Sequence, residues 1–118
     1  MYAEIWTYRE ELRPNVKHLK GYKVEATDGS IGKVDEATDE IGGSAIVVDT
    51  GPWIFGRKVV IPAGTIERID MESETLHVGM TKDQIKNAPE YDEERSWRED
   101  EYRNRLGDYY GSTYRRAG

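Results

Sequence analysis

The side chains able to do chemistry in this chain are few, and their spacing argues against a catalytic centre. Its two histidines, His18 and His77, lie far apart, and neither has a second histidine at the short spacing typical of a metal site. Ser30, Ser44 and Ser73 fall in predicted turns, and nothing in the sequence suggests that any of them is a nucleophile. The absence of cysteine excludes a disulfide, a thiolate zinc site and a cysteine nucleophile. We therefore expect a protein that is not an enzyme and carries no metal or cofactor.

Two groups of acidic residues have the oxygen ligands that cations prefer. They are Asp35-Glu36 with Asp39-Glu40, and Asp92-Glu93-Glu94. Neither has the spacing of a calcium loop, with its central glycine and final glutamate. We interpret both groups as solvated, charged surface.

The stretch DTGPWIFGRKVVIP, residues 49–62, places two aromatic side chains between two glycines and follows them with Arg57 and Lys58. One interpretation is an exposed loop that grips a ligand. The other is a corner between two strands, where both aromatic side chains share a parity and plug the open end of a barrel. We favour the plug, because proline and glycine suit such a corner. Its residues are Gly51, Trp53, Phe55 and Gly56.

Aromatic and basic residues also concentrate near both ends of the chain. In the last thirty residues, arginines and tyrosines alternate with acidic residues. Mixed signs along a helix usually mean solvent-facing pairs, whereas interleaved tyrosines and arginines could stack on RNA. Tyrosine, tryptophan and arginine are also the residue types that anchor protein interfaces. The candidate contact residues are Trp6, Tyr8, Trp97, Tyr102, Leu106, Tyr109 and Tyr110.

The bulk composition describes one small acidic domain. The chain has 118 residues and a net charge of -6, from 17 Lys and Arg against 23 Asp and Glu. Such a chain repels a phosphate backbone unless its basic residues cluster, so we do not expect nucleic acid as the partner. No apolar run approaches the roughly 20 residues that span a bilayer, and no signal-peptide pattern opens the chain. We expect a cytoplasmic protein without a membrane span.

The elements that must position these residues are mainly strands. Tyr22, Val24 and Ala26 alternate with charged residues, as in a half-buried strand, and Asp28-Gly29 is a hairpin signal. Short strands at close spacing with glycine punctuation indicate a small sandwich or barrel. The further strands are predicted at 31–36, 45–48, 58–61, 65–70 and 75–78.

The chain divides into three regions. Residues 1–20 form an N-terminal arm. Because Pro14 interrupts any helix, we expect either an extended arm that lies on the barrel through its aromatic residues or a frayed terminus. Residues 21–92 form the β domain, which ends in a short helix from about Lys82, opened by a capping box of Thr81 and Gln84. Residues 93–118 form a charged, tyrosine-rich tail, in which a second, weakly amphipathic helix is predicted.

Three stretches occur in order: GYKVEATDGSIGKVDEATDE (residues 21–40), VVDTGPWIFGRKVVIPAG (47–64) and TKDQIKNAPEYD (81–92), with a weaker fourth, YRNRLGDYYG (102–111). Together they resemble the PRC-barrel family, in particular its stand-alone actinobacterial members. The resemblance implies a mainly β fold: a small, partly open six-stranded barrel followed by a short helix. Relatives include the cytoplasmic domain of the photosynthetic reaction-centre H subunit and the C-terminal domain of the ribosome maturation factor. This chain lacks the membrane helix of the first and the N-terminal barrel of the second, so neither role carries over.

The function we expect is a non-enzymatic protein–protein interaction or scaffolding module that self-associates, with a dimer favoured and the protein partner unknown. An open barrel has edge strands that must be paired or covered, and the two arms could cover their own barrel or a neighbouring copy. One alternative is an RNA- or ribosome-associated assembly factor. A further alternative is a barrel that holds a small ligand or pigment. This alternative is weaker, because the interior of so small a barrel should be filled by its own side chains.

Overall fold

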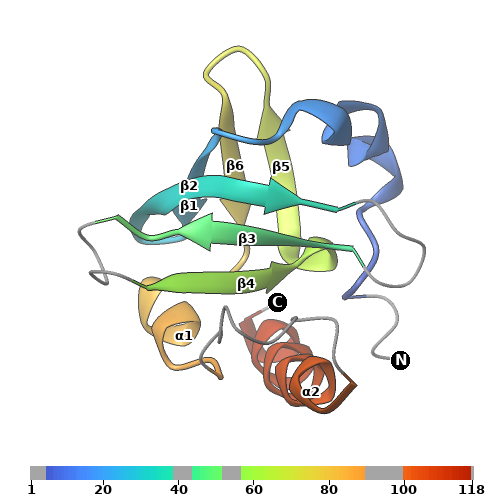
Figure 1. Cartoon of the computed structure of the whole chain (residues 1–118), viewed down its shortest axis with the longest axis vertical. Coiled ribbons are helices and arrows are strands. Elements are labelled where there is room, and N and C mark those ends of the chain that lie inside the picture. The colour runs from blue at the N-terminus through green and yellow to red at the C-terminus, as the bar shows by residue number, and fades with distance from the viewer. Residues whose placement is uncertain (1–4, 39–43, 52–56, 90–99, 118) are drawn as a thin grey trace.

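A computed structural model describes residues 5–38, 44–51, 57–89 and 100–117 of the chain. Six strands form one mixed sheet in the order β4-β3-β2-β1-β6-β5, and the sheet is not closed (Figure 1). Neighbouring strands are antiparallel, except that β1 and β6 are parallel. The strands are β1 (Lys23–Ala26), β2 (Gly29–Ala37), β3 (Ala45–Asp49), β4 (Lys58–Pro62), β5 (Ile66–Asp70) and β6 (Thr75–Val78). The prediction of a mainly β fold with six strands is confirmed.

Local turn chemistry connects the strands. The β1–β2 hairpin turns at Thr27 and Asp28, one residue earlier than predicted, and Gly29 then pairs with Ala26. The β5–β6 hairpin is held by Asp70, whose carboxylate accepts hydrogen bonds from the backbone N–H groups of Glu72 (3.0 Å) and Ser73 (3.2 Å). Short polar side chains satisfy turn backbones in this way.

The short helix α1 (Lys82–Lys86) confirms the capping box. The Thr81 hydroxyl accepts from the backbone N–H of Gln84 at 3.1 Å, and the Gln84 side chain accepts from the backbone N–H of Thr81 at 2.8 Å. The backbone N–H of Lys82 donates to the carboxylate of Asp28 at 2.8 Å. This contact ties α1 to the β1–β2 turn.

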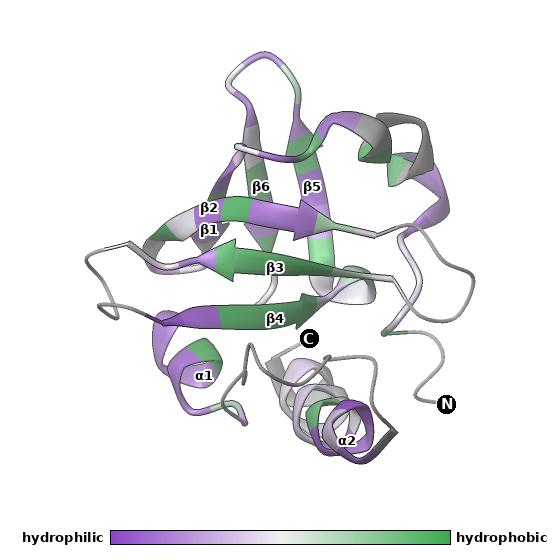
Figure 2. Ribbon diagram, in the orientation of Figure 1, coloured by the Kyte–Doolittle hydropathy of each residue, from purple (hydrophilic) through white to green (hydrophobic). Residues whose placement is uncertain are grey.

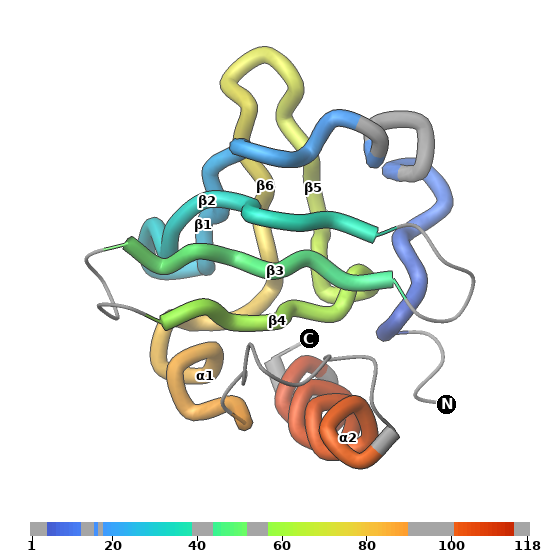
Figure 3. The backbone as a smooth tube through the Cα atoms, in the orientation of Figure 1, coloured from blue at the N-terminus to red at the C-terminus, as the bar shows by residue number. Residues whose placement is uncertain are grey.

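The N-terminal arm corrects one prediction. It is not extended, because residues Glu10–His18 form a 3₁₀ helix, η2, that contains Pro14. Leu12, Val16 and Leu19 recur at helical spacing and are buried against the sheet, and this burial outweighs the backbone donor that proline removes. The arm runs along the side of the sheet where β5 lies, and its first described residues reach towards the C-terminal helix (Figure 3).

The C-terminal tail contains an 18-residue helix, α2 (Asp100–Ala117), which lies beside β4 (Figure 1). The predicted second helix is confirmed for its described part, where Leu106 and Tyr110 are fully buried. The earlier part of the predicted helix, which contains Tyr91, Arg95 and Arg98, lies outside the described residues.

The core sits inside the curved sheet and extends to both ends of the chain. β3 and β4 are almost continuously apolar (Figure 2) and buried, as expected for strands covered on both faces. The same buried cluster contains Trp6 and Leu19 from the arm and Leu106 from α2. The arm and the tail therefore complete the core rather than project from it.

Candidate binding site

A row of polar residues crosses the whole sheet near one end of its strands. The strand register pairs each member with the next, from β5 through β6, β1, β2 and β3 to β4. Residues paired in this way point to the same face of a sheet. The row consists of Asp70, Thr75, Lys23, Lys33, Asp49 and Lys58.

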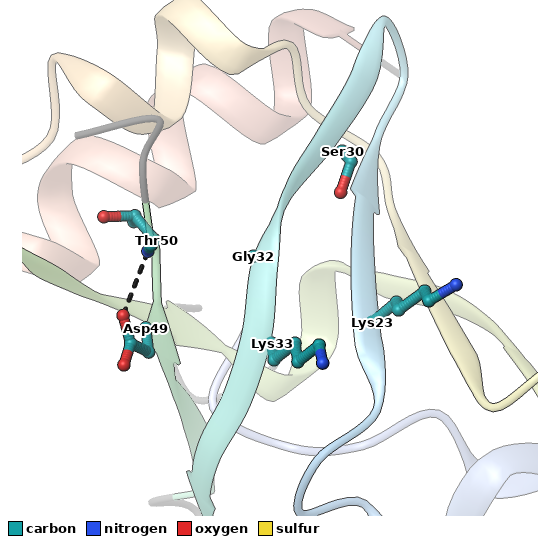
Figure 4. A pocket seen from close by; sticks show the side chains of 7 residues that line it. Lys23, Ser30, Gly32, Lys33, Asp49 and Thr50 are labelled. Atoms are coloured by element: carbon teal, nitrogen blue, oxygen red, sulfur yellow. Dashed lines mark hydrogen bonds between the residues drawn. The ribbon is translucent and has the colours of Figure 1, made fainter. Parts of the chain in front are cut away.

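Lys23 and Lys33 are the unusual members of this row. They are directly opposed on β1 and β2, both are exposed, and Figure 4 shows their side chains extending in the same direction. Like charges in this position repel each other. Within the described part of the chain, no carboxylate lies within ion-pair distance of either ammonium group. The pair therefore concentrates positive charge on a chain that is acidic overall.

The lysine pair lines an open pocket of about 340 Å³, together with Ser30, Gly32, Asp49, Thr50 and Gly51 (Figure 4). Gly32 forms its floor, where β2 passes close to the end of β3. A Cβ atom on Gly32 would lie 2.0 Å from the carbonyl oxygen of Asp49, and the φ of Gly32 is +146°. Only glycine allows both this conformation and this approach.

The rim of the pocket is held by residues just after β3 and just before β4. The Thr50 hydroxyl donates to the carbonyl oxygen of Arg57 at 2.6 Å. Arg57 in turn donates through its guanidinium to the carbonyl oxygen of Ala88 at 3.4 Å. Gly51 has a φ of +55° and donates its backbone N–H to the carboxylate of Asp49 at 3.0 Å. The position of the Asp49 carboxylate is thus set by the turn that follows it.

The last cation of the row is neutralised within the chain. The ammonium group of Lys58 donates to the carboxylate of Asp35 at 3.1 Å, as an ion pair and a hydrogen bond. Lys23 and Lys33 therefore differ from Lys58 in keeping their positive charge available at the pocket.

The structural plug and the contact residues predicted from the sequence fall in different places. Gly51 lies at the pocket, while Trp53, Phe55 and Gly56 lie outside the described residues, as does Trp97. Trp6 and Tyr8 are 3% and 2% exposed, and Leu106 and Tyr110 are fully buried. Tyr102 and Tyr109 are half-buried. In this structure, the buried candidates pack against other residues of their own chain and present no surface to a partner.

The contacts of these residues join the arm and the tail to the sheet. The Arg103 guanidinium lies 5.1 Å from the centroid of the Trp6 ring, a cation–π geometry. The Tyr109 hydroxyl donates to the carbonyl oxygen of Gln84 at 2.6 Å, and the Tyr102 hydroxyl donates to that of Pro89 at 3.4 Å. The tail is thus tied both to the arm and to the segment that contains α1.

A small polar cluster closes the far end of α2. The Tyr114 hydroxyl donates to the carboxylate of Glu67 at 3.0 Å and accepts a hydrogen bond from Arg9. Arg9 also lies 3.6 Å from the Glu67 carboxylate. Burial, followed by the hydrogen bond to Glu67, raises the pKa of Tyr114.

The lysine pair was not predicted from the sequence. Lys23 and Lys33 are ordinary polar positions in two strands of alternating polarity. Whether they pair with each other depends on the register of the β1–β2 hairpin. The register shifts between Val24 and Glu25, so counting residues back from the turn does not identify the partners. The usable signal was the alternation itself, which places Lys23 on the face opposite to Val24.

Among the residues that the structure describes, no group of three or more histidines and acidic residues could hold a metal ion. Within the same residues, no helix is both long and apolar enough to cross a membrane. Comparison with models of known protein families finds no match, and comparison with curated proteins finds none.

Proposed function

We propose that this chain is a non-enzymatic binding module that recognises a protein partner through the pocket beside Lys23 and Lys33. The observation that carries the proposal is the direct opposition of two exposed lysines that have no carboxylate nearby in the described part of the chain. Their repulsion does not help the fold, whereas an anionic group of a partner would relieve it and gain two charge-assisted hydrogen bonds.

The rest of the described surface supports a polar recognition face. Among the described residues, Met71 is the one large apolar side chain that is exposed, with 44% of its surface in solvent. A partner that bound a broad apolar surface would need a larger exposed patch than one side chain. Charge complementarity at the pocket is therefore the stronger basis for recognition.

We further propose that the fold is of the PRC-barrel type. The motifs of residues 21–40, 47–64 and 81–92 support this proposal, and so does an unclosed six-stranded sheet followed by a short capped helix. Members of that family hold other macromolecules in place, which agrees with a binding role. In this proposal the arm and α2 are structural covers of the sheet.

Self-association remains part of the proposal, with a dimer as the favoured state. Trp6 and Leu106 are buried within the chain, so two intact copies would meet through other residues. We expect light scattering to show a dimer that persists when Tyr102 or Tyr109 is replaced by phenylalanine. A monomer at every concentration tested would remove self-association from the proposal.

Site-specific photocrosslinking tests the binding role. A photoreactive phenylalanine analogue replaces Ser30, which is exposed in the pocket, and in a second protein it replaces Ser112, which is exposed on α2. In native cell extract, the Ser30 probe should capture a defined protein partner that the Ser112 probe does not capture.

Charge variants give this experiment its control. The double variant Lys23→Gln/Lys33→Gln should reduce the yield at position 30 roughly tenfold, because it removes both charged contacts of the pocket. The matched variant Lys86→Gln/Arg105→Gln removes the same charge from exposed positions on α1 and α2 and should leave the yield unchanged. Equal losses in the two double variants would mean that net charge, and not the pocket, attracts the partner.

A further inference from the structure

The pocket carries charges of both signs, and this limits the ligands that fit it. Asp49 is the register partner of Lys33 on β3, and both line the pocket. The hydrogen bond from the backbone N–H of Gly51 fixes the Asp49 carboxylate at 3.0 Å. The two lysines on β1 and β2 therefore have a carboxylate beside them on the next strand, β3, and a backbone hydrogen bond sets the position of that carboxylate.

The register gives the spacing of the backbone positions that carry these charges. Neighbouring strands lie about 4.8 Å apart, so the midpoint between the backbone positions of Lys23 and Lys33 is about 7 Å from that of Asp49 along the row. In an extended peptide, residues i and i+2 point to the same side and lie about 6.7 Å apart. An extended segment that crosses the strands therefore matches the pocket when an acidic residue and a basic residue are two positions apart.

We propose that the pocket binds an extended peptide segment in which an aspartate or glutamate at position i bridges Lys23 and Lys33 and a lysine or arginine at position i+2 pairs with Asp49. This inference rests on the proposed function and names the partner chemistry of the same site. A uniform polyanion, such as a run of glutamates or a single-stranded RNA, would place negative charge against Asp49. Like charges at that distance repel each other, so the pocket selects against both.

The test uses two synthetic peptides, Gly-Ser-Glu-Ser-Lys-Ser-Gly and Gly-Ser-Glu-Ser-Glu-Ser-Gly, together with oligouridine. Each is titrated into the full-length, isotope-labelled chain at low salt, and the backbone amide signals are followed by NMR. The peptide of mixed charge should shift the signals of Lys23, Lys33 and Gly51 and bind at least about threefold more tightly than the acidic peptide.

Asp49→Asn is the decisive variant. The amide oxygen of asparagine can still accept the hydrogen bond from Gly51, so the turn is kept while the charge is lost. The variant should bind the acidic peptide more tightly than the mixed peptide, which reverses the order. Lys33→Gln should weaken the binding of both peptides.

The outcomes separate this inference from the proposed function. If the unchanged protein prefers the acidic peptide, and Lys33→Gln abolishes that binding, the pocket binds a partner but Asp49 does not select it, and the inference is overturned alone. The same holds if Asp49→Asn leaves the order of the two peptides unchanged. Tighter binding of oligouridine than of either peptide, or no binding of any probe, would overturn both the inference and the proposed function.

Discussion

The guanidinium of Arg103 lies 5.1 Å from the centre of the Trp6 ring, so that the C-terminal helix and the N-terminal arm meet beside the open sheet. Trp6 is 3% exposed, and its carbonyl oxygen accepts from the backbone N–H of Ser44 at 2.7 Å. The two ends of the chain thus share one buried cluster with the strands, and both belong to the folded unit.

Replacement of Trp6 tests this shared core. Trp6→Ala should lower the free energy of unfolding by about 3–5 kcal/mol, because a large buried side chain is lost and a cavity remains. Chemical denaturation measures the change, and Met71→Ala provides the control, because Met71 is 44% exposed and should cost little. Equal, small effects of both substitutions would show that the arm does not pack on the sheet in solution.

Two neighbouring tyrosines of α2 should respond in opposite ways to loss of the hydroxyl. The Tyr109 hydroxyl donates to the carbonyl oxygen of Gln84 at 2.6 Å, so Tyr109→Phe should lower the free energy of unfolding by about 1 kcal/mol. The Tyr110 hydroxyl is buried without a hydrogen-bond partner among the described residues, and burial raises its pKa. Tyr110→Phe should therefore leave the protein equally stable or more stable by about 1 kcal/mol.

Thermal or chemical unfolding of the two variants gives the comparison. The Tyr109 and Tyr110 rings have centroids 5.4 Å apart in an edge-to-face arrangement, which phenylalanine preserves. A clear loss of stability in Tyr110→Phe would contradict the proposed packing of α2.

Because β2 and β3 approach closely at Gly32, replacing this glycine by alanine should destabilise the protein more than the same replacement at Gly51. Gly32→Ala should lower the free energy of unfolding by about 3 kcal/mol or more, because the new Cβ atom would meet the backbone of Asp49. At Gly51, where φ is +55° and nothing lies within 4 Å of a Cβ atom, alanine should cost only about 1–2 kcal/mol of backbone strain. If the order of the two costs is reversed, the pocket floor is wrongly described.

The hairpin between β5 and β6 should make stability depend on pH in the acid range. Hydrogen bonds from Ser73, reinforced by that from Glu72 and by the charge of Arg68, hold the pKa of Asp70 below its ordinary value of 3.8. Because the pKa in the folded state is lower than in the unfolded state, this carboxylate stabilises the fold above pH 3.8, and the contribution is lost as pH falls through the folded pKa.

An NMR titration of the Asp70 carboxyl carbon measures that pKa directly. Asp70→Ala should remove this part of the acid dependence without changing the response above neutral pH. A measured pKa at or above 3.8 would show that the carboxylate does not cap the turn.

Much of the sheet could be predicted because its signals are local. The alternation of Tyr22, Val24 and Ala26 predicted β1 correctly, and the capping box of Thr81 and Gln84 located α1. Both depend on residues within a few positions of one another, which is where sequence patterns are informative.

The helical conformation of the arm and the pocket depend on distant contacts, and sequence patterns did not reveal them. Pro14 indicated an extended arm, but burial of Leu12 and Val16 against the sheet favours the 3₁₀ helix instead. The opposition of Lys23 and Lys33 requires a hairpin whose register shifts. No pattern along the chain identifies such a pair before the strands are aligned.

The central claim is that Lys23 lies opposite Lys33 for binding and not for stability. Lys23→Glu replaces two opposed like charges by an ion pair across the strands, so it should raise the free energy of unfolding by about 0.5 kcal/mol. The variant is therefore a folded protein with an altered pocket, which separates binding from folding.

The most direct measurement is the crosslink yield at position 30 in the Lys23→Glu variant, in native cell extract. We predict a yield roughly tenfold below that of the unchanged protein, despite equal or greater stability. A yield equal to that of the unchanged protein would contradict the account.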